Sequence, residues 1–432
     1  MADAFTWISA HADPFHVVSA FDAAGRVIPS SSIVFWLFAF IVVRYTLPDL
    51  ALWLAYIVRP RAFEPPPLRR YAGAEPLVSV IIAGRNPGRR IVTTIRSVLE
   101  SDYHNVEIIF ADDCSTDDSV AIARTFERTG RVRVFANANH SGKPANLNLA
   151  LMFVRGEFVF VLDSDTQMYP DTIDRMLPYF EDPRVGAVSA SIFVRNPGAS
   201  LITRFQRIEY ILTYTLTQLW RDRLGIIAIV CGMGAMFRTS ALRGLGGFDM
   251  GLGDDTDLTI RLRKVRWRLR MSLRARISTD VPETLARLLR QRARWTRNMV
   301  KVRLRKHRDL GTFRYGFANA VVFYDGLLNR AFRPVALVCL IVLVHLYRGS
   351  DVPLVMGGIY AFSTLMLLMK ALIGRDMTGE PSLGSFCLAP LYVFYRVPLL
   401  LTQATQVVRE VLRIKTWHPY VPRRIWDQIP HH

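Results

Sequence analysis

The chain has few cysteines and a shortage of acids. Its 432 residues include four widely separated cysteines with neither metal-ligand spacing nor a disulfide framework, Cys114, Cys231, Cys339 and Cys387, which favours a reducing compartment. Lys and Arg number 55 against 36 Asp and Glu, a formal net charge of +19. No nucleic-acid module accompanies this charge, and arginines cluster beside apolar stretches. We therefore expect a membrane surface and an anionic substrate as partners, and no nucleic acid.

Internal repeats and low-complexity tracts are not found in the sequence, and its first residues are not typical of a cleavable signal peptide. Residues 1–30 are mixed and polar and lack the cationic start of a cleavable signal peptide. A chain of this length normally has more than one domain. Its hydrophobic fraction of 51%, combined with the basic charge, predicts a membrane protein with a large basic cytosolic part.

One long apolar stretch lies near the start. Residues 32–58 are long enough to cross a bilayer, which takes ~20 residues. Arg44, Pro48 and Asp49 interrupt the stretch, so two short apolar pieces are the alternative. The basic residues that follow place this end in the cytosol by the positive-inside rule: Arg59, Arg61, Arg69 and Arg70. Three prolines at 65–67 predict a stiff linker.

The last third contains further candidate crossings, at 335–347, 352–373 and 386–408, the last with Arg396 inside it. Three crossings would leave the C-terminus outside. The basic residues near that end favour the cytosol: Arg409, Arg413, Lys415, Arg423 and Arg424. Either the last segment does not span, or residues 313–333, which we interpret as interfacial, do.

Two acids follow a buried strand in the middle of the chain. Residues 158–162, FVFVL, are apolar on both faces, as in a parallel sheet covered by helices. Asp163 and Asp165 come directly after them. Ligands of such sheets bind beyond the carboxyl ends of the strands. Two carboxylates there can hold a divalent cation, which can hold a diphosphate. The alternative is a solvated Asp-Ser-Asp turn.

Strands and helices alternate on the N-terminal side of this stretch. We predict strands at 77–83, 106–110 and 132–136, and helices at 91–100, 119–129 and 146–154. That order predicts an α/β fold with parallel strands. Asp112 and Asp113 follow the second strand closely. Acids therefore follow a strand end twice, at the edge where ligands bind.

Six segments, in this order, resemble the inverting family 2 glycosyltransferases, and within them the membrane-embedded synthases of cellulose, chitin, poly-N-acetylglucosamine and hyaluronan. The segments are VSVIIAGRN, EIIFADDCSTDDS, HSGKPANLNLAL, Asp163-Ser164-Asp165, GFDMGLGDDTDLTIRL and QRARW at 291–295, and they cover roughly residues 77 to 308. Where the family often has a Glu after the first-strand Asn, Pro87 follows Asn86 here. The resemblance implies a GT-A-like, Rossmann-type mixed sheet with transmembrane and interfacial helices.

On this resemblance the chain divides into four parts. Residues 1–70 would hold a transmembrane helix and the linker, and 71–280 the cytosolic GT-A glycosyltransferase domain. Residues 281–333 would form interfacial helices, and 334–432 a C-terminal transmembrane region with a basic tail. The implied location is the inner (plasma) membrane, with several crossings and the catalytic domain in the cytosol.

The resemblance also implies a site for a UDP-sugar. Asp113, or its neighbour Asp112, would accept a hydrogen bond from uracil, unless one of them merely caps the helix at Ser119. Mg²⁺ or Mn²⁺ on Asp165, with Asp163 nearby, would neutralise the diphosphate, and a lysine adds a point charge. The residues expected to bind the donor are Asn86, Asp112, Asp113, Lys143, Asp163, Gln291 and Arg294.

Asp255 matches the family's catalytic base, which takes the proton of the acceptor hydroxyl. Asp254 and Asp257 are local competitors, and all these acids also suit the start of a helix at 256–265. Direct attack with one base implies inversion, so an α-linked donor would give a β-linked product. The residues expected at the acceptor are Trp295, Cys231, Gly232 and Asp254. For Cys231 and Gly232 the alternative is a tight turn.

The arginine-dense segment 287–308 has two interpretations. Most of its arginines suit an amphipathic helix on the anionic cytosolic leaflet. Arg294, however, would face the leaving diphosphate, and Trp295 would stack on a sugar ring, unless it anchors the helix at the membrane interface. Residues 201–220 are predicted to form another interfacial helix.

The expected function is extension and export of a β-linked polysaccharide by a membrane glycosyltransferase. The spacing of Asp254, Asp255 and Asp257 is more similar to the poly-N-acetylglucosamine and cellulose types than to the hyaluronan type. The alternative is a glycolipid synthase resembling ceramide glucosyltransferase. A third interpretation is a membrane nucleotide-binding or regulatory subunit without turnover, which the intact acids Asp113, Asp165 and Asp255 disfavour. The sugar, the linkage and the oligomeric state stay open.

Overall fold

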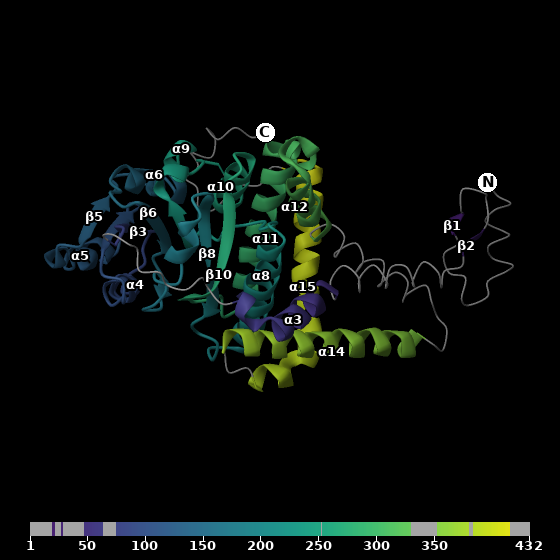
Figure 1. The fold of residues 1–432 in the computed structure, drawn as a ribbon. Helices are drawn as coiled ribbons and strands as arrows, with labels where there is room; N and C mark the ends of the chain where they lie inside the picture. The colour runs from purple at the N-terminus through teal and green to yellow at the C-terminus, as the bar shows by residue number, and fades with distance from the viewer. Residues whose placement is uncertain are drawn as a thin grey trace.

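The computed structural model describes residues 20–21, 27–28, 47–63, 75–251, 253–329, 352–379 and 383–414 (Figure 1). Several predictions fall elsewhere in the chain: the first part of the stretch 32–58, the proline linker, the crossing at 335–347, the end of segment 313–333 and the basic tail from Lys415 onward lie outside the described residues.

A mixed sheet of eight strands forms the centre, in the order β5-β4-β3-β6-β9-β8-β10-β7. The strands are β3 (Val78–Gly84), β4 (Val106–Asp112), β5 (Val132–Ala136), β6 (Phe158–Asp163), β7 (Thr166–Met168), β8 (Val185–Val194), β9 (Gly234–Arg238) and β10 (Arg268–Thr279). Strands β3 to β6 pair in parallel, whereas β9 runs antiparallel to both β6 and β8. The predicted mixed α/β sheet is confirmed. A separate short pair, β1 (Ala20–Phe21) and β2 (Val27–Ile28), precedes it.

The central strands form because both of their faces are covered. On β3, Val80 and Ile82 belong to one hydrophobic core, while Ile81 and Ala83 belong to the core on the other face. Strand β6 divides in the same way and its apolar residues are buried throughout. This two-sided burial explains the uninterrupted apolar runs of the sequence.

Helices between and after the strands pack around the sheet or, in the case of α11 and α12, beside it. They are α4 (Arg90–Leu99), α5 (Ser119–Arg124), α6 (Lys143–Met152), α7 (Leu201–Tyr210), α8 (Thr217–Arg223), α9 (Thr239–Gly244), α10 (Asp254–Lys264), α11 (Leu285–Lys301) and α12 (Phe317–Leu327). Helix α4 buries Ile91, Ile95 and Val98, the 3.6-residue spacing that predicted it. The helix predicted at 201–220 is interrupted by a π-helical segment, Ile211–Leu216, between α7 and α8.

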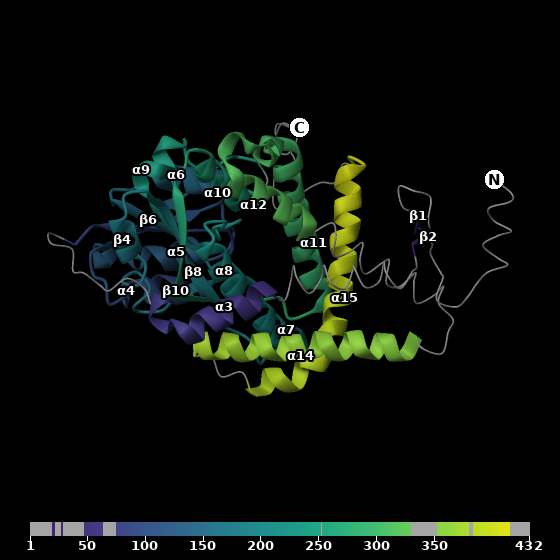
Figure 2. The same cartoon turned by 45° about the vertical axis from the view of Figure 1, so that its right-hand side comes forward.

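Three helices outside the sheet domain are α3 (Leu47–Val58), α14 (Val352–Thr378) and α15 (Leu383–Val411). In both views α11 lies between the sheet and α15, and α14 crosses beside α3 and α15 (Figures 1 and 2). Helices α14 and α15 cover the predicted crossings at 352–373 and 386–408. Within the described ranges, one helix is long and apolar enough to span a membrane, Cys387–Val411 of α15. The other crossings stay predictions.

Helix α11 corrects one expectation. The segment 287–308 was expected to place most of its arginines on the membrane surface. Two arginines depart from this expectation, because Arg292 of α11 and Arg303 just after it are buried inside the protein. The other arginines of the segment are half-buried (Arg294, Arg297 and Arg305) or exposed (Arg287, Arg290 and Arg308), and their contact with a membrane stays a prediction. Arg292 is buried because the middle of α11 packs against α15 and pairs with Glu209 of α7, whereas the first turns of α11 are exposed.

Candidate active site at the carboxyl edge of the sheet

The strand register brings the polar loops together at one edge. Gly84 at the end of β3 pairs with Asp112 of β4, and the preceding Ala83 pairs with Asp163 of β6. Because β9 runs antiparallel to β6, its first residue, Gly234, pairs with Leu162. The turn that contains Cys231 and Gly232 therefore lies beside Asp163. This edge is where ligands of such sheets bind.

Lys143 is the cation at the centre of this edge. It begins α6, and its Nζ donates to Asp163 Oδ1 at 2.5 Å. Burial alone would lower the pKa of Lys143, but the charges of Asp163, Asp254 and Asp255 raise the pKa above its ordinary value, so the ammonium stays charged. A Cβ on Gly232 would lie 3.9 Å from this Nζ and 3.5 Å from the Asp255 Cβ. The structure thus gathers Lys143, Asp163, Gly232, Asp254 and Asp255.

Asp255 has the properties of a proton acceptor. It lies in the first turn of α10, which Gly253 begins in the left-handed region with φ +79°. Burial, followed by the charge of Asp254, raises the pKa of Asp255 to about 6, against the opposing charge of Lys143 and the Thr256 N–H, which donates to Oδ1 at 2.7 Å. A carboxylate with such a pKa is ionised at neutral pH and still basic enough to take a proton.

Asp257, the other competitor for this role, is committed to ion pairs. Its carboxylate accepts from Arg261 Nε at 2.6 Å and from Lys306 Nζ at 2.7 Å, and it contacts His307 Nε2 at 2.8 Å. Burial would raise the pKa of Asp257, but the contacts with His307, Lys306 and Arg261 lower it well below the ordinary range. Asp257 therefore fastens α10 to Lys306 and His307.

Asp165 and Asp163 repel one another. Asp165 lies just before β7, and its pKa is raised by burial, then by the charge of Asp163, with Arg90 opposing. A divalent cation would relieve this repulsion, so the two residues fit a site for Mg²⁺ or Mn²⁺. In the described part of the chain, no group of three or more His, Cys, Asp or Glu side chains could hold a metal. The pair therefore suits an ion whose remaining ligands are water and phosphate oxygens.

Asp112 and Asp113 are bonded to their own loops. Asp113 is 4% exposed and accepts from the backbone N–H groups of Ser141 at 2.7 Å and Gly142 at 2.9 Å, while His140 Nδ1 lies 2.7 Å from it. Asp112 accepts from the N–H and the hydroxyl of Ser115. Neither acid caps the helix at Ser119, so that alternative is wrong; Asp117 accepts from the Ser119 N–H instead. Uracil recognition by Asp112 or Asp113 stays a prediction.

Asn86 ties two loops of the same edge together. Its backbone is in the left-handed region, with φ +52°, which Asn tolerates better than most residues. Its N–H donates to Ser115 Oγ and its Oδ1 accepts from the Thr116 N–H, each at 2.8 Å. The side chain thus holds the loop after β4, and its contact with a nucleotide stays a prediction.

A second group of predicted site residues lies on α11 and is separate from the acids around Lys143. Its members, all half-buried, are Gln291, Arg294 and Trp295. The two groups are connected through Gly253, where a Cβ would approach Asn298 at 3.4 Å and Val302 at 3.1 Å. The start of α10 thus packs against α11 one helical turn beyond Trp295. This contact brings the helix with Trp295 to the residues before Asp254 and Asp255.

Comparison with known proteins identifies the domain. Residues 79–246 match the model of Glycosyl transferase family 2. This part of the chain, which holds strands β3 to β9, is similar to family 2 glycosyltransferases. Asp254, Asp255 and α11 lie beyond the matched residues, so their roles depend on the geometry described above.

Two curated relatives carry different names. A β-monoglucosyldiacylglycerol synthase of a Nostoc species is 29% identical over 244 residues, which are 55% of this chain and 51% of that protein. A poly-β-1,6-N-acetyl-D-glucosamine synthase of Staphylococcus epidermidis is 28% identical over 230 residues, 53% of this chain and 56% of that protein. The chain thus spans about half the length of these relatives.

A solved structure shares the fold. A mannosyltransferase from Pyrobaculum calidifontis, in complex with GDP-mannose and Mn²⁺, superposes with a TM-score of 0.56 at 20% sequence identity, and the match covers 86% of this chain and 98% of that one. At this identity the likeness establishes the fold of the glycosyltransferase domain.

Sequence reasoning missed two residues beside Trp295. Arg292 lies three residues before Trp295 on α11, and its guanidinium carbon is 4.3 Å from the centre of the indole ring. Glu209 of α7 accepts from Arg292 at 2.9 Å. The available signals were the i, i+3 spacing on one helix face and the position of Glu209 as the single acid in 201–220.

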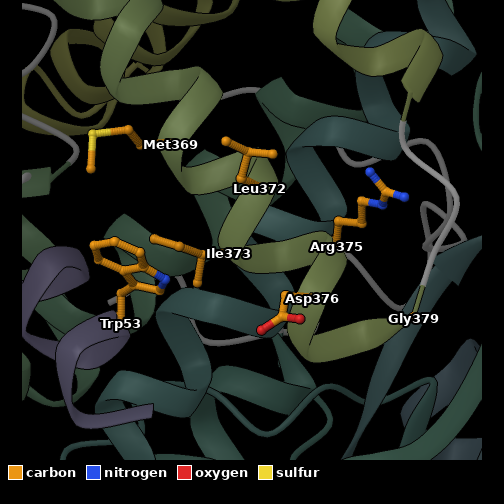
Figure 3. A pocket seen from close by; sticks show the side chains of 7 residues that line it. All are labelled: Trp53, Met369, Leu372, Ile373, Arg375, Asp376 and Gly379. Atoms are coloured by element: carbon orange, nitrogen blue, oxygen red, sulfur yellow. The ribbon is translucent and has the colours of Figure 1, made fainter. Parts of the chain in front are cut away.

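A cavity of about 730 Å³ lies between α3 and α14, away from these residues (Figure 3). Its lining is Trp53, Met369, Leu372, Ile373, Arg375, Asp376 and Gly379. None of them is among the residues expected to bind the donor or the acceptor.

Proposed function

We propose that the protein is a membrane-embedded inverting glycosyltransferase that transfers a sugar from a UDP-sugar to a growing β-linked polysaccharide and helps to export it. One observation carries the proposal: Asp163, Asp254 and Asp255 converge on the Lys143 ammonium at the carboxyl edge of the sheet. A cation and a proton acceptor side by side are what transfer from a diphosphate donor requires.

The donor diphosphate would lie over Asp163, Asp165 and Lys143. Asp165 and Asp163 would hold Mg²⁺ or Mn²⁺, and the ion acts as a Lewis acid that stabilises charge on the leaving diphosphate. Lys143 adds a positive charge that its ion pair with Asp163 keeps in place. Gln291 and Arg294 would approach the same diphosphate from α11. The nucleoside would extend toward Asn86, Asp112 and Asp113.

Asp255 would remove the proton from the acceptor hydroxyl. As the hydroxyl oxygen forms a bond to the anomeric carbon, the bond from that carbon to the phosphate oxygen breaks, and its electron pair leaves with the UDP. The proton passes to Asp255 Oδ. Attack opposite the leaving group inverts the carbon, so an α-linked donor gives a β-linked product. General-base catalysis of this kind contributes roughly 100- to 10,000-fold in rate.

The acceptor sugar would stack on Trp295 and approach through Cys231, Gly232 and Asp254. Gly232 has no side chain, so a sugar ring can come close to Asp255 there. An aromatic face grips a sugar through apolar contact and depends little on register. Trp295 therefore suits a chain that advances after each transfer.

The second candidate is a glycolipid synthase that adds one sugar to a membrane lipid. The relative from Nostoc, a β-monoglucosyldiacylglycerol synthase, favours this candidate. Its identity to this chain is 29%, against 28% for the polysaccharide synthase from Staphylococcus epidermidis. The proposed chemistry at Lys143 and Asp255 is the same in both cases.

Product size separates the two candidates. The purified full chain in lipid nanodiscs is incubated with Mg²⁺ or Mn²⁺ and each of a panel of radiolabelled UDP-sugars, with Asp255→Asn as the background. A ladder or high-mass glycan made from one donor supports the polysaccharide synthase. One organic-extractable, single-sugar product at every donor concentration supports the glycolipid synthase instead. Absence of any transfer above background with every UDP-sugar contradicts both.

A further inference from the structure

A buried carboxylate joins three helices that are distant in sequence. Glu209 of α7, which is 6% exposed, accepts a hydrogen bond from Arg292 of α11 at 2.9 Å. From α15 it accepts a hydrogen bond from the Tyr395 hydroxyl at 2.8 Å and from Arg396 at 3.3 Å. The helix that carries Trp295 and the candidate membrane helix thus share one anion.

The same arginine contacts the tryptophan. The Arg292 guanidinium lies over the Trp295 ring, and its Nη1 is 3.4 Å from the Tyr214 hydroxyl. The Tyr214 ring in turn meets Trp295 edge-on, with centroids 6.3 Å apart. Tyr214 belongs to the π-helical segment Ile211–Leu216, a type of irregularity that is frequent at functional sites. Arg292 and Tyr214 therefore limit how the indole can turn.

The network resists separation because its charges are buried. Two guanidinium groups share one carboxylate, so withdrawal of Glu209 would leave the buried Arg292 and the partly buried Arg396 uncompensated, which is strongly unfavourable. The Tyr395 ring also stacks on Phe205 of α7, with centroids 5.0 Å apart. A displacement of α15 would consequently be passed to Arg292, and from there to Trp295.

We propose that Glu209 is a positioning residue that couples α15 to Trp295 through Arg292, so that the seating of α15 sets the orientation of the acceptor-binding indole. The inference rests on the proposed acceptor role of Trp295 for its functional consequence, but not for the coupling itself. In this proposal α15, the candidate membrane helix, affects sugar transfer through its contact with Glu209.

The coupling is tested without any activity. The full chain is labelled with 5-fluorotryptophan, and the ¹⁹F resonance that Trp295→Phe removes is assigned to Trp295. Tyr395→Phe deletes the hydroxyl that bonds Glu209 and keeps the ring on Phe205, so folding is expected to persist. The matched control is Tyr360→Phe, which deletes a hydrogen bond to the Pro390 carbonyl of α15 with no link to Glu209. The Trp295 resonance is expected to shift or broaden in Tyr395→Phe and to stay in place in Tyr360→Phe.

The functional consequence is measured with the UDP-sugar that the wild type consumes. Tyr395→Phe is expected to shorten the products or lower transfer by several-fold, with the affinity for UDP unchanged, and Tyr360→Phe to match the wild type. A Trp295 resonance that is the same in wild type and Tyr395→Phe overturns the inference. So does an equal loss of transfer in both variants, because a loss without specificity is general destabilisation. If the wild type transfers no sugar, the proposed function fails while the resonance still tests the coupling.

Discussion

At the scale of residues, the site is a balance among charges of opposite sign in a half-buried space. Lys143 is held by Asp163 and stays ionised because Asp254 and Asp255 are near it. Asp255 and Asp165, by contrast, have raised pKa values because burial and a neighbouring acid disfavour their charged forms. Binding of the donor diphosphate and its metal ion would change the pKa of each of these groups, because it adds charges beside them.

The raised pKa of Asp255 predicts the acid limb of the pH profile. Since only the ionised carboxylate accepts a proton, kcat/KM is expected to fall about tenfold per pH unit below about pH 6 and to level off above it. A profile flat between pH 5 and pH 7 would exclude Asp255 as the base.

The raised pKa of Asp255 also predicts that the folded state becomes less stable as pH rises. The pKa of Asp255 is raised on folding, so its contribution to stability is fully present below about pH 4 and is lost as pH rises through about 6. Asp255→Asn resembles the protonated state, and its thermal midpoint is expected to exceed that of the wild type at pH 8 and to equal it at pH 4. A lower midpoint at pH 8 would argue against burial as the cause of the shift.

Asp165→Asn tests the metal. The variant halves the charge available to a cation, and transfer is expected to fall by at least about 100-fold, because Lewis-acid stabilisation is worth several kcal/mol. Chelator should abolish wild-type transfer, and Mg²⁺ or Mn²⁺ should restore it. Asp118→Asn, an exposed acid with no side-chain capping bond, serves as the control. An undiminished rate in excess chelator would remove the ion from the mechanism.

Residue types and spacing anticipated some of these positions but not their bonds. The proximity of Asp163 to the ends of β3 and β4 follows from parallel strands, whose carboxyl ends share an edge. The bonds of Asp113 to the N–H groups of Ser141 and Gly142 depend on a loop conformation that spacing does not encode. For the same reason Arg292 escaped notice, since its partner Glu209 lies 83 residues away.

At the scale of elements, α10 is fastened from both sides. Lys306 Nζ bonds Asp249 Oδ1 at 2.8 Å, before the loop that leads to Asp255, and Asp257 Oδ1 at 2.7 Å, beyond it. His307 contacts the same Asp257. This clamp, defined by Lys306, Asp249 and Asp257, holds the loop at both ends and so fixes where Asp255 lies.

Removal of the clamp should leave the domain folded but make the position of Asp255 less fixed. Lys306→Met is expected to lower kcat by up to about tenfold, roughly 1.4 kcal/mol, with the affinity for UDP retained. The control is Arg308→Met, which removes an exposed charge two residues further on. Wild-type kcat in Lys306→Met would show that the clamp does not position Asp255.

Periodicity predicted the four parallel strands β3 to β6 and missed the later strands β7 to β10. Strands β3, β4 and β6 are buried on both faces and leave plain apolar runs. Strand β10 reads as a basic segment, because Arg268 and Arg270 alternate with its apolar residues and are neutralised by the distant Asp182 and Asp222. Its register also shifts twice along β8, which breaks the period.

At the scale of the whole molecule, the glycosyltransferase domain and the apolar helices are joined through α11, which lies between the sheet and α15 (Figure 2). Sequence patterns predicted both parts and an interfacial role for the segment that contains α11, but not the burial of Arg292 inside the protein. Burial of Arg292 by Glu209 could not be foreseen, since a lone arginine on an amphipathic helix is ordinarily solvated.

The proposed topology is tested from either side of the membrane. A protease-cleavable tag inserted after Arg70 is expected to be protected in intact spheroplasts and cut in inverted vesicles, because the arginines that flank the first apolar stretch favour the cytosol. Cleavage in intact spheroplasts would place the domain outside and away from cytosolic UDP-sugars.

The central claim is that Asp255 acts as the base in transfer from a UDP-sugar bound near Lys143 and Asp163. It is tested most directly by measuring UDP affinity and sugar transfer side by side in wild type, Asp255→Asn and Asp102→Asn, an exposed acid just before β4. We predict that all three bind UDP equally, that Asp102→Asn transfers sugar at the wild-type rate, and that transfer by Asp255→Asn falls by about 100-fold or more. Transfer by Asp255→Asn at the wild-type rate, with saturating donor, would contradict the account.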